Sequence, residues 1–309
     1  MSELLGLKHL LGMKDTSKEQ ILHILKEAQR MKRQVLMGGK KDSCLSGKSV
    51  ITLFYENSTR TRLSFELASK YLGAAAANIA ASGSSVAKGE TLIDTVKTID
   101  AMAADVIIIR HQASGAPHLA SQYTRASIVN AGDGMNEHPT QALLDFMTIQ
   151  EKKGGFEGLK VAIVGDVKHS RVARSNIYGL RKLGAEVTIA GPTTLMPAEA
   201  EELGVKAYFN VDQAVKDADV VMGLRIQLER QKKGLFPTVR EYHKYFGIDR
   251  HRLALAKPDA IVMHPGPVNR GVELADDVID GAQSVIEEQV TNGVCVRMAV
   301  LNLLANGNS

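Results

Sequence analysis

The feature that most restricts the fold is an alternation of short apolar runs with longer helix-like or loop stretches. The runs are SVITLFY, AANIA, DVIIIR and ASIVN in the first half, and LKVAIVGD, AEVTIAG, ADVVMGL and DAIVMHPGP in the second. Such runs are typical of parallel sheets, whose strands are buried on both faces. The sequence therefore predicts an α/β protein with two doubly wound parallel-sheet domains.

Helix signals indicate where these domains begin and end. Ser17 and Gln20 form a capping box before a helix with one apolar face, and a second helix is predicted from Pro139 to Glu151. The KKGGFEG stretch after it is both a helix stop and an interdomain boundary. A helical pattern over about 283–306 is expected to pack back on the first domain. The expected parts are a first domain of 1–136 plus 286–309, a connecting helix at 137–150 and a second domain of 151–285.

Composition excludes several classes of function. The 309 residues are 44% hydrophobic and 23% charged, and the net charge of +4 is spread along the chain, which gives little support to a nucleic-acid or membrane partner. Cys44 and Cys295 are far apart and form no CxxC pair, so neither a metal site nor a disulfide framework is expected. Lys8 and His9 interrupt the apolar N-terminus, and no run reaches membrane-spanning length. We expect a cytoplasmic protein.

Polar residues with ligand chemistry follow most of the predicted strands. They include STRTR, Arg110 with His111, GDGMNEHPTQ, GDVKHSRVAR, Arg225 with Gln227, and HPGPVNR. Any one of these segments is more simply explained as a solvated loop. Open parallel sheets, however, bind ligands beyond the carboxyl ends of their strands, and these segments coincide at that edge. Their coincidence predicts a ligand site.

The STRTR segment has the chemistry of an anion site. Ser58 is expected to be an N-cap, and the backbone N–H groups of the first turn add to the positive end of the helix dipole. Arg60 in this turn is tolerable if an anion arrives there, and Arg110 adds a planar fork suited to phosphate. The alternative is an exposed basic helix start, which the dipole disfavours. No triphosphate loop or dinucleotide motif is present, so the phosphate is assigned to a small substrate and no cofactor is expected.

The order of these motifs carries a resemblance to a known family. STRTR, SSVAKGETLIDT, GDGMNEHPTQALLD, VGDVKHSRVARS, RIQLER and HPGPVNRGVE resemble the catalytic chains of aspartate carbamoyltransferases over essentially the whole length. STRTR and HPTQ are shared with ornithine carbamoyltransferases. The ornithine enzymes carry HCLP where this chain has His264-Pro265-Gly266-Pro267, and they lack the RIQ pattern. The resemblance therefore favours the aspartate enzymes.

The resemblance implies an activity and a first substrate site. The chain would transfer the carbamoyl group of carbamoyl phosphate to L-aspartate, giving N-carbamoyl-L-aspartate and phosphate, an early step of pyrimidine biosynthesis. Thr61, Arg110 and His138 would meet the carbamoyl oxygen, which gains negative charge during attack. Gln141 lies one turn after His138 if Pro139 takes the first helical position; a polar helix cap is the alternative for His138. The side-chain amide of Gln141, with backbone carbonyls near Pro265 to Pro267, would accept the carbamoyl NH2 group. The implied carbamoyl phosphate residues are Ser58, Thr59, Arg60, Thr61, Arg110, His138, Gln141, Pro265, Gly266 and Pro267.

Aspartate needs two cationic anchors for its two carboxylates. Arg171 and Arg225 match the family's positions, with Gln227 in support, whereas Arg174 either contributes or lies on a solvated helix face. The loop before Arg171 departs from the family's more common tyrosine form, because it contains KHSR.

The ASGSSVAKGE stretch is small and polar, and by itself it is typical of a surface loop. The resemblance implies instead that Ser84 and Lys88 reach into a neighbouring subunit's site, where Lys88 contacts phosphate and the substrate carboxylate. The active site would then lie in the cleft between the domains and at a subunit interface of a homotrimer. The catalytic set is Arg60, Thr61, Arg110, His138 and Lys88.

Other functions stay open from sequence alone. The acceptor is another amino acid such as ornithine in one alternative, and the chain is a non-catalytic phosphate-ligand-binding relative in another. A regulatory chain or a dihydroorotase-like protein is a candidate partner.

Overall fold

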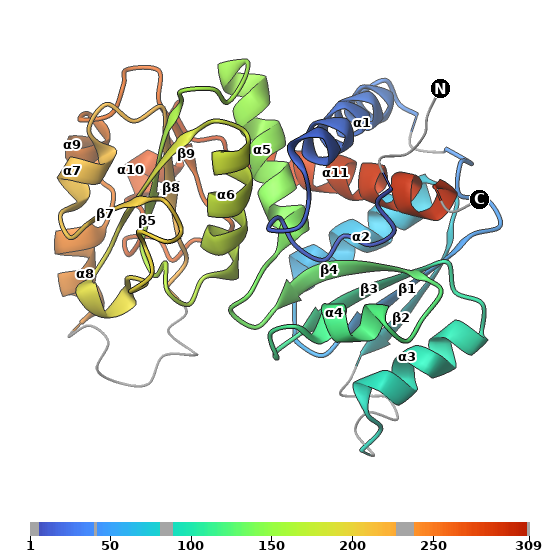
Figure 1. The fold of residues 1–309 in the computed structure, drawn as a ribbon. Helices are drawn as coiled ribbons and strands as arrows, with labels where there is room; N and C mark the ends of the chain where they lie inside the picture. The colour runs from blue at the N-terminus through green and yellow to red at the C-terminus, as the bar shows by residue number, and fades with distance from the viewer. Residues whose placement is uncertain (1–5, 40–41, 81–88, 227–237, 308–309) are drawn as a thin grey trace. The chain divides into compact units, whose positions relative to one another are not determined.

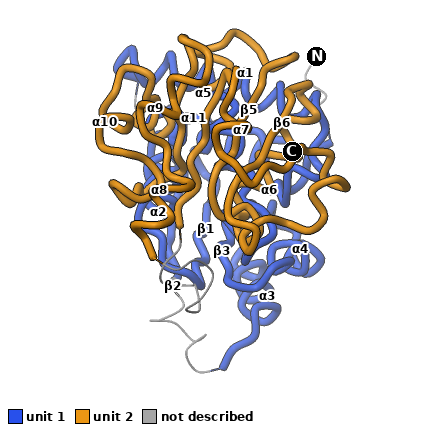
Figure 2. Tube along the Cα trace, turned by 90° about the vertical axis from the view of Figure 1, so that its left-hand side faces the viewer, with its two compact units in different colours: residues 1–147, 291–309 blue, residues 148–290 orange. Residues whose placement is uncertain are grey.

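The computed structural model describes residues 6–39, 42–80, 89–226 and 238–307. The chain divides into two compact units, one of residues 1–147 with 291–309 and one of residues 148–290 (Figure 2). Each unit contains a single parallel sheet flanked by helices (Figure 1). The predicted α/β class with two parallel sheets is confirmed.

The first unit is built on the four-stranded sheet β2-β1-β3-β4, in which every neighbouring pair is parallel. Each predicted apolar run forms one strand: β1 (Ser49–Phe54), β2 (Ala75–Ala80), β3 (Val106–His111) and β4 (Ser127–Asp133). The chain passes from β1 to β2 on one side and then crosses to β3 on the other. The strand order therefore reverses between β1 and β3.

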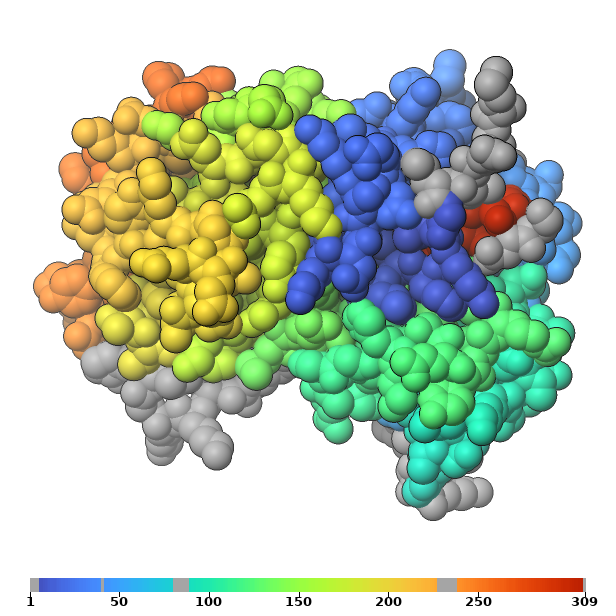
Figure 3. All heavy atoms as spheres, in the orientation of Figure 1, coloured from blue at the N-terminus to red at the C-terminus, as the bar shows by residue number. Residues whose placement is uncertain are grey.

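Helices cover both faces of this sheet. Helices α1 (Lys18–Leu36), α2 (Thr59–Tyr71) and α11 (Ile286–Asn306) lie on one side, and α3 (Leu92–Ala101) and α4 (Ala116–Ser121) lie on the other (Figure 1). The capping box before α1 is confirmed, since the Ser17 and Gln20 side chains each bond the other's backbone N–H. Helices α1, α3 and α4 form part of this unit's surface in Figure 3.

The core between the sheet and α3 and α4 uses alternate strand positions, as a pleated strand requires. Its buried members are Leu53, Val96, Ile99, Ile107, Ile109, Ala120, Ala126 and Ile128.

The second unit is built on the five-stranded parallel sheet β7-β6-β5-β8-β9. Its strands are β5 (Lys160–Val164), β6 (Glu186–Ala190), β7 (Lys206–Tyr208), β8 (Val220–Gly223) and β9 (Ile261–Met263). Strand β7 was not predicted, because its three residues carry no apolar run. The chain builds outward from β5 through β6 to β7 and then crosses to β8, so the order reverses between β5 and β8.

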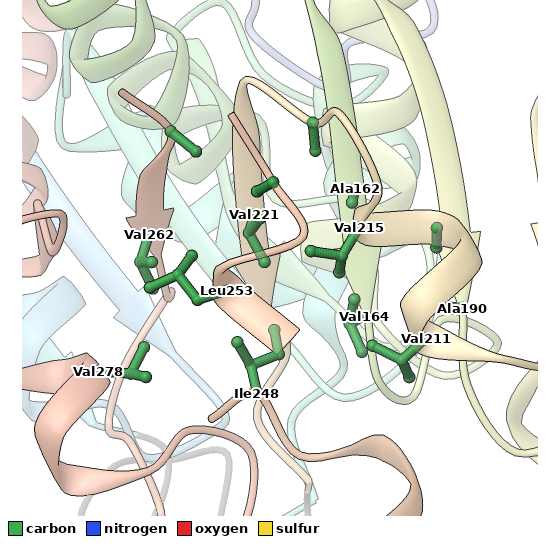
Figure 4. Packing of buried hydrophobic residues seen from close by; sticks show 14 of the residues in the cluster. Ala162, Val164, Ala190, Val211, Val215, Val221, Ile248, Leu253, Val262 and Val278 are labelled. Carbon is green, nitrogen blue, oxygen red and sulfur yellow. The ribbon is translucent and has the colours of Figure 1, made fainter. Parts of the chain in front are cut away.

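One face of this second sheet packs on short helices. The connecting segments form α6 (Arg171–Lys182), a 3-10 turn (Thr193–Leu195), α7 (Val211–Val215), α8 (Val239–Phe246), α9 (Arg250–Leu253) and α10 (Asp276–Ile279). Ala162, Val164 and Val221 of the strands meet Val215 of α7 and Leu253 of α9 in a wholly apolar cluster (Figure 4). Burial of apolar surface contributes about 25 cal/mol per Å² to the free energy of folding. The cluster therefore stabilises the sheet that holds the loops at its strand ends.

Helix α5 (Pro139–Lys153) is longer than predicted by two residues, and it stops before Gly154, whose φ is 80°. The division between the two units falls within this helix, after Met147. Among the described helices, none is long and apolar enough to cross a membrane.

Candidate active site

The predicted cations lie at the point of strand reversal in each unit. In the first unit, Arg60 follows β1 at the start of α2, and Arg110 is the second-last residue of β3. In the second unit, Arg171 follows β5 and Arg225 follows β8. Since ligands bind where the strand order of an open parallel sheet reverses, both positions are candidate sites on topology alone.

Helix α2 begins at Thr59, directly after the predicted N-cap residue Ser58. Ser58 occupies the N-cap position with extended backbone, but its side chain makes no capping hydrogen bond to the helix. The first turn contains no acidic residue, Thr61 is buried, and Arg60 is exposed. The helix start thus combines N–H groups that Ser58 does not cap with hydroxyl and guanidinium groups, which is suitable for an anion.

Arg110 is held by the two strands beside it. Its Nη1 donates to the carbonyl of Ala131 in β4 at 3.0 Å, and its Nε lies 3.2 Å from Oε2 of Glu56 after β1. Its backbone carbonyl accepts from Tyr55 N–H at 2.8 Å. The guanidinium is therefore oriented at the sheet edge, next to the segment that leads into α2.

A buried acidic network shapes the loop between β4 and α5. Asp133 accepts from Gly115 N–H at 2.7 Å, from Asn130 at 2.8 Å and from Glu137 N–H at 3.1 Å. Glu137 in turn accepts from Met13 N–H at 2.6 Å. Sequence reasoning did not single out these residues. The signal was their position inside GDGMNEHPTQ, where buried carboxylates paired with backbone N–H groups fix a loop ahead of a helix.

His138 and Gln141 lie together at the start of α5. The His138 carbonyl accepts from Gln141 N–H at 3.0 Å and from Ala142 N–H at 3.2 Å, so Pro139 does take the first helical position, as predicted. His138 is 4% exposed and Gln141 is 9% exposed. Gln141 Nε2 donates to Oδ1 of Asp145 at 3.1 Å. A polar helix cap in contact with solvent would be more exposed than these two side chains are.

In the second unit, Arg171 is the first residue of α6. Ser170 caps this helix by accepting from Ala173 N–H at 3.1 Å, and Arg171 is buried. Arg174 instead pairs with Glu199 at 3.6 Å and is half-buried, which is the surface alternative for this residue.

Glu273 links Arg225 to the loop after β9. Its carboxylate accepts from Ile226 N–H at 2.7 Å and from Asn269 N–H at 2.9 Å, and it also accepts from the Asn269 side chain at 2.6 Å. Asn269 Nδ2 lies 3.1 Å from the Ile226 carbonyl as well. Burial raises the pKa of Glu273 above its ordinary value, and the hydrogen bonds oppose that shift. Sequence reasoning missed this residue, which ties the segment containing Arg225 to the HPGPVNR loop.

The predicted Pro265–Gly266–Pro267 segment follows β9 directly. Gly266 N–H donates to His264 Nδ1 at 2.9 Å, and the Gly266–Pro267 peptide bond is cis.

In the loop before α6, where the sequence departs from the family's usual form, His169 Nδ1 lies 2.9 Å from Asp166 Oδ1.

Three predicted residues, Ser84, Lys88 and Gln227, lie outside the described residues. Within the described ranges, no group of three or more His, Cys, Asp or Glu side chains is arranged to hold a metal ion.

Two doubly wound units with cations at both points of strand reversal define a class of α/β proteins that bind small anionic ligands at their sheet edges. Within that class, the chain belongs to the aspartate/ornithine carbamoyltransferase family. Residues 8–151 match its carbamoyl-P binding domain, and residues 157–304 match its Asp/Orn binding domain.

Relatives and solved structures agree with this family. An aspartate carbamoyltransferase catalytic subunit from Ruminiclostridium cellulolyticum is 68% identical over 297 residues, which are 96% of this chain and 95% of the relative. An ornithine carbamoyltransferase from Pyrococcus furiosus has a TM-score of 0.87 at 34% identity over 98% of both chains. The Trypanosoma cruzi aspartate transcarbamoylase in complex with carbamoyl aspartate and phosphate has a TM-score of 0.86 at 31% identity over 97% of both chains.

Proposed function

We propose that this chain is an aspartate carbamoyltransferase, which transfers the carbamoyl group of carbamoyl phosphate to the amino group of L-aspartate. The observation that carries the proposal is the placement of Arg60 and Arg110 at one point of strand reversal and of Arg171 and Arg225 at the other. The first pair suits a phosphate and the second pair suits a dicarboxylate. The fold alone does not choose the acceptor, because aspartate and ornithine enzymes both share it. The high identity to an aspartate enzyme supports aspartate.

The first unit supplies the chemistry of carbamoyl activation in this proposal. Ser58, Thr59, Arg60 and the N–H groups of α2 bind the phosphate. Thr61, Arg110 and His138 stabilise the negative charge that develops on the carbamoyl oxygen as the amine attacks the carbonyl carbon. The bond between the carbamoyl carbon and the phosphate oxygen then breaks, the departing phosphate takes up the proton that the amine loses, and Arg60 and Arg110 stabilise its negative charge.

The second unit supplies the acceptor site. Arg171 and Arg225 bind the two aspartate carboxylates with support from Gln227, and the Glu273 network holds the segment of Arg225 in place. Residues 1–136 with 286–309 act as the carbamoyl phosphate-binding domain, 137–150 as the connecting helix and 151–285 as the aspartate-binding domain. The two family matches support this division of labour.

The test is steady-state kinetics with carbamoyl phosphate and a set of acceptors. Aspartate and ornithine differ in the charge at the end of the side chain, so two cationic anchors favour aspartate strongly. Saturable turnover with aspartate, and at least about a hundredfold lower kcat/KM with ornithine, is expected. Comparable turnover with ornithine contradicts the acceptor assignment, and no turnover with either contradicts carbamoyl transfer.

We also propose that the active unit is a homotrimer whose sites are shared, with Ser84 and Lys88 contributed by a neighbouring subunit. The family resemblance supports this part of the proposal. A Lys88→Ala protein and an Arg60→Ala protein, each inactive alone, should regain activity when mixed, because some mixed sites then contain both wild-type residues. Native mass spectrometry verifies that subunits exchange. Exchanged hybrids without activity contradict the shared site.

Location and larger assemblies follow from the same proposal. The proposed location is the cytoplasm, and a regulatory chain or a dihydroorotase-like protein is a candidate partner. Purification of the tagged chain from its source, followed by mass measurement of the intact assembly, tests both the trimer and the partner.

A further inference from the structure

Two buried charged residues of the first unit, Asp145 and Arg297, are not used by the mechanism above. Asp145 stands one turn after Gln141 on α5 and is fully buried, and Arg297 on α11 is 4% exposed. The negative charge of Asp145 favours the charged form of Arg297, so the two residues interact electrostatically within the first unit. Charged side chains without access to solvent are costly to bury, so an acid and a base of this kind close to a proposed substrate residue call for a role.

Asp145 decides which way the Gln141 amide points. An ionised carboxylate accepts hydrogen bonds and donates none, so only the amide nitrogen of Gln141 is a suitable partner. That bond is 3.1 Å long. The amide oxygen is consequently directed elsewhere, and among the described residues no donor bonds to it.

The Arg297 side chain is held in place by contacts within the first unit. Its guanidinium lies 5.0 Å from the centre of the Phe65 ring of α2, and its Nη1 donates to the Gly293 carbonyl at 3.0 Å. A Cβ atom at Gly293 would lie 2.7 Å from Nη1, so the helix has no side chain where the guanidinium lies. Burial lowers the pKa of Arg297 to about 10, which leaves it a cation at neutral pH, and the negative charge of Asp145 opposes that shift.

We propose that Asp145 is a positioning residue that orients Gln141 so that its amide oxygen accepts a hydrogen bond from the carbamoyl NH2 group of the substrate. The inference rests on the proposed function, since it needs carbamoyl phosphate as the ligand. It assigns Asp145 a role in substrate selection: the site recognises a ligand with an N–H donor at this position and rejects one without it.

A matched pair of ligands tests this role directly. Carbamoyl phosphate and acetyl phosphate differ only in an NH2 group against a methyl group, and inorganic phosphate lacks the acyl part altogether. The wild-type protein is expected to bind carbamoyl phosphate about tenfold more tightly than acetyl phosphate, the effect of one hydrogen bond. Competition calorimetry at low temperature measures all three dissociation constants.

The informative variant is Asp145→Asn, because an asparagine either donates or accepts and no longer imposes one orientation on Gln141. The preference for carbamoyl over acetyl phosphate is expected to fall to about twofold or less, while inorganic phosphate binding stays within about twofold of wild type. Asp15→Asn, at an exposed carboxylate of the same unit, is the matched control and should keep the preference. A double variant with Arg297→Met removes both buried charges and carries the test if the single variant does not fold.

The outcomes separate the two proposals. A preference that survives in the folded variants overturns the positioning role and leaves the proposed function intact. Equal weakening of all three ligands also overturns it, since Asp145 then acts only through the structure of the anion site. A wild-type protein with no preference for carbamoyl phosphate overturns both proposals.

Discussion

Arg110 and Glu56 form an ion pair across the carboxyl ends of β3 and β1, with 3.2 Å between Nε and Oε2. Their side chains are 12% and 15% exposed, so the pair is little screened by solvent. A carboxylate therefore lies beside the cation that is proposed to bind phosphate.

This pairing predicts opposite effects of two neutralising substitutions. Glu56→Gln removes a repelling charge and is expected to tighten binding of inorganic phosphate several-fold, whereas Arg110→Gln should weaken it by about tenfold or more. Calorimetry at fixed ionic strength measures both constants. A change in the same direction for both variants contradicts an anion site at Arg110.

Arg60→Ala is expected to remove nearly all activity and to leave the fold intact. Loss of a charge-assisted phosphate contact costs about 1.5–3 kcal/mol, and more when transition-state charge is also unpaired. Arg62→Ala, an exposed arginine two residues later on the same helix, is the control and should keep most activity. The kcat/KM of each variant is compared with that of the wild-type protein, and thermal melting checks that each variant is folded. Near-normal turnover in Arg60→Ala contradicts a phosphate site at the start of α2.

Glu273→Gln is expected to weaken aspartate binding without touching the phosphate site. A glutamine has only one acceptor oxygen for the donors of Ile226 and Asn269, so its amide nitrogen opposes an N–H group. The segment that includes Arg225 then loosens, and we expect a several-fold higher KM for aspartate and a loss of about 1–3 kcal/mol in the free energy of unfolding. Arg225→Ala should raise the same KM more strongly. If carbamoyl phosphate affinity falls equally in both variants, these residues do not serve the acceptor.

Ala103→Gly is expected to stabilise the protein. Ala103 follows the end of α3 with φ of 59°, a left-handed conformation that costs a residue with a Cβ about 1–2 kcal/mol and a glycine nothing. After the greater entropy loss of glycine is subtracted, a gain of about 0.5–1 kcal/mol remains. Asp217→Gly, at φ of 58°, should gain less, because aspartate tolerates this region better. Urea unfolding compares the two, and a destabilised Ala103→Gly protein refutes the prediction.

The pH dependence of stability should carry a contribution from His9. Burial lowers the pKa of His9 from 6.5 to about 4, and its Nδ1 accepts from Ile128 N–H at 3.0 Å. Between these two pH values the unfolded chain binds a proton that the folded chain does not, so stability is full above pH 6.5 and is lost as the pH falls toward 4. His9→Asn keeps an acceptor and removes the titration, so its melting temperature should fall less steeply over this range. Parallel pH profiles for the two proteins contradict the prediction.

The strands show which parts of the fold could be predicted from the local pattern of apolar residues. All eight apolar runs became strands, and most of them are buried on both faces, which requires apolar residues at consecutive positions; β2 is the exception, because Ala75 to Asn78 are exposed. Strand β7 was not predicted, because Lys206 and Ala207 are exposed and the segment therefore contains no apolar run. The start of α2 and the helical position of Pro139 were also predictable, since both follow from residue preferences within one turn.

By itself, the sequence determined the order of elements, the α/β class and the chemical character of the strand ends, because side-chain periodicity and helix signals act within a few residues of each other. Only the tertiary structure decided which buried acids hold those strand ends. Glu137 accepts from Met13 N–H, and Glu273 accepts from Ile226 N–H. The partners in each pair are remote in sequence, and a carboxylate looks the same in a sequence whether it is solvated or buried. Packing alone makes the difference, because a buried carboxylate is tolerated only where folding brings it donors or a cation.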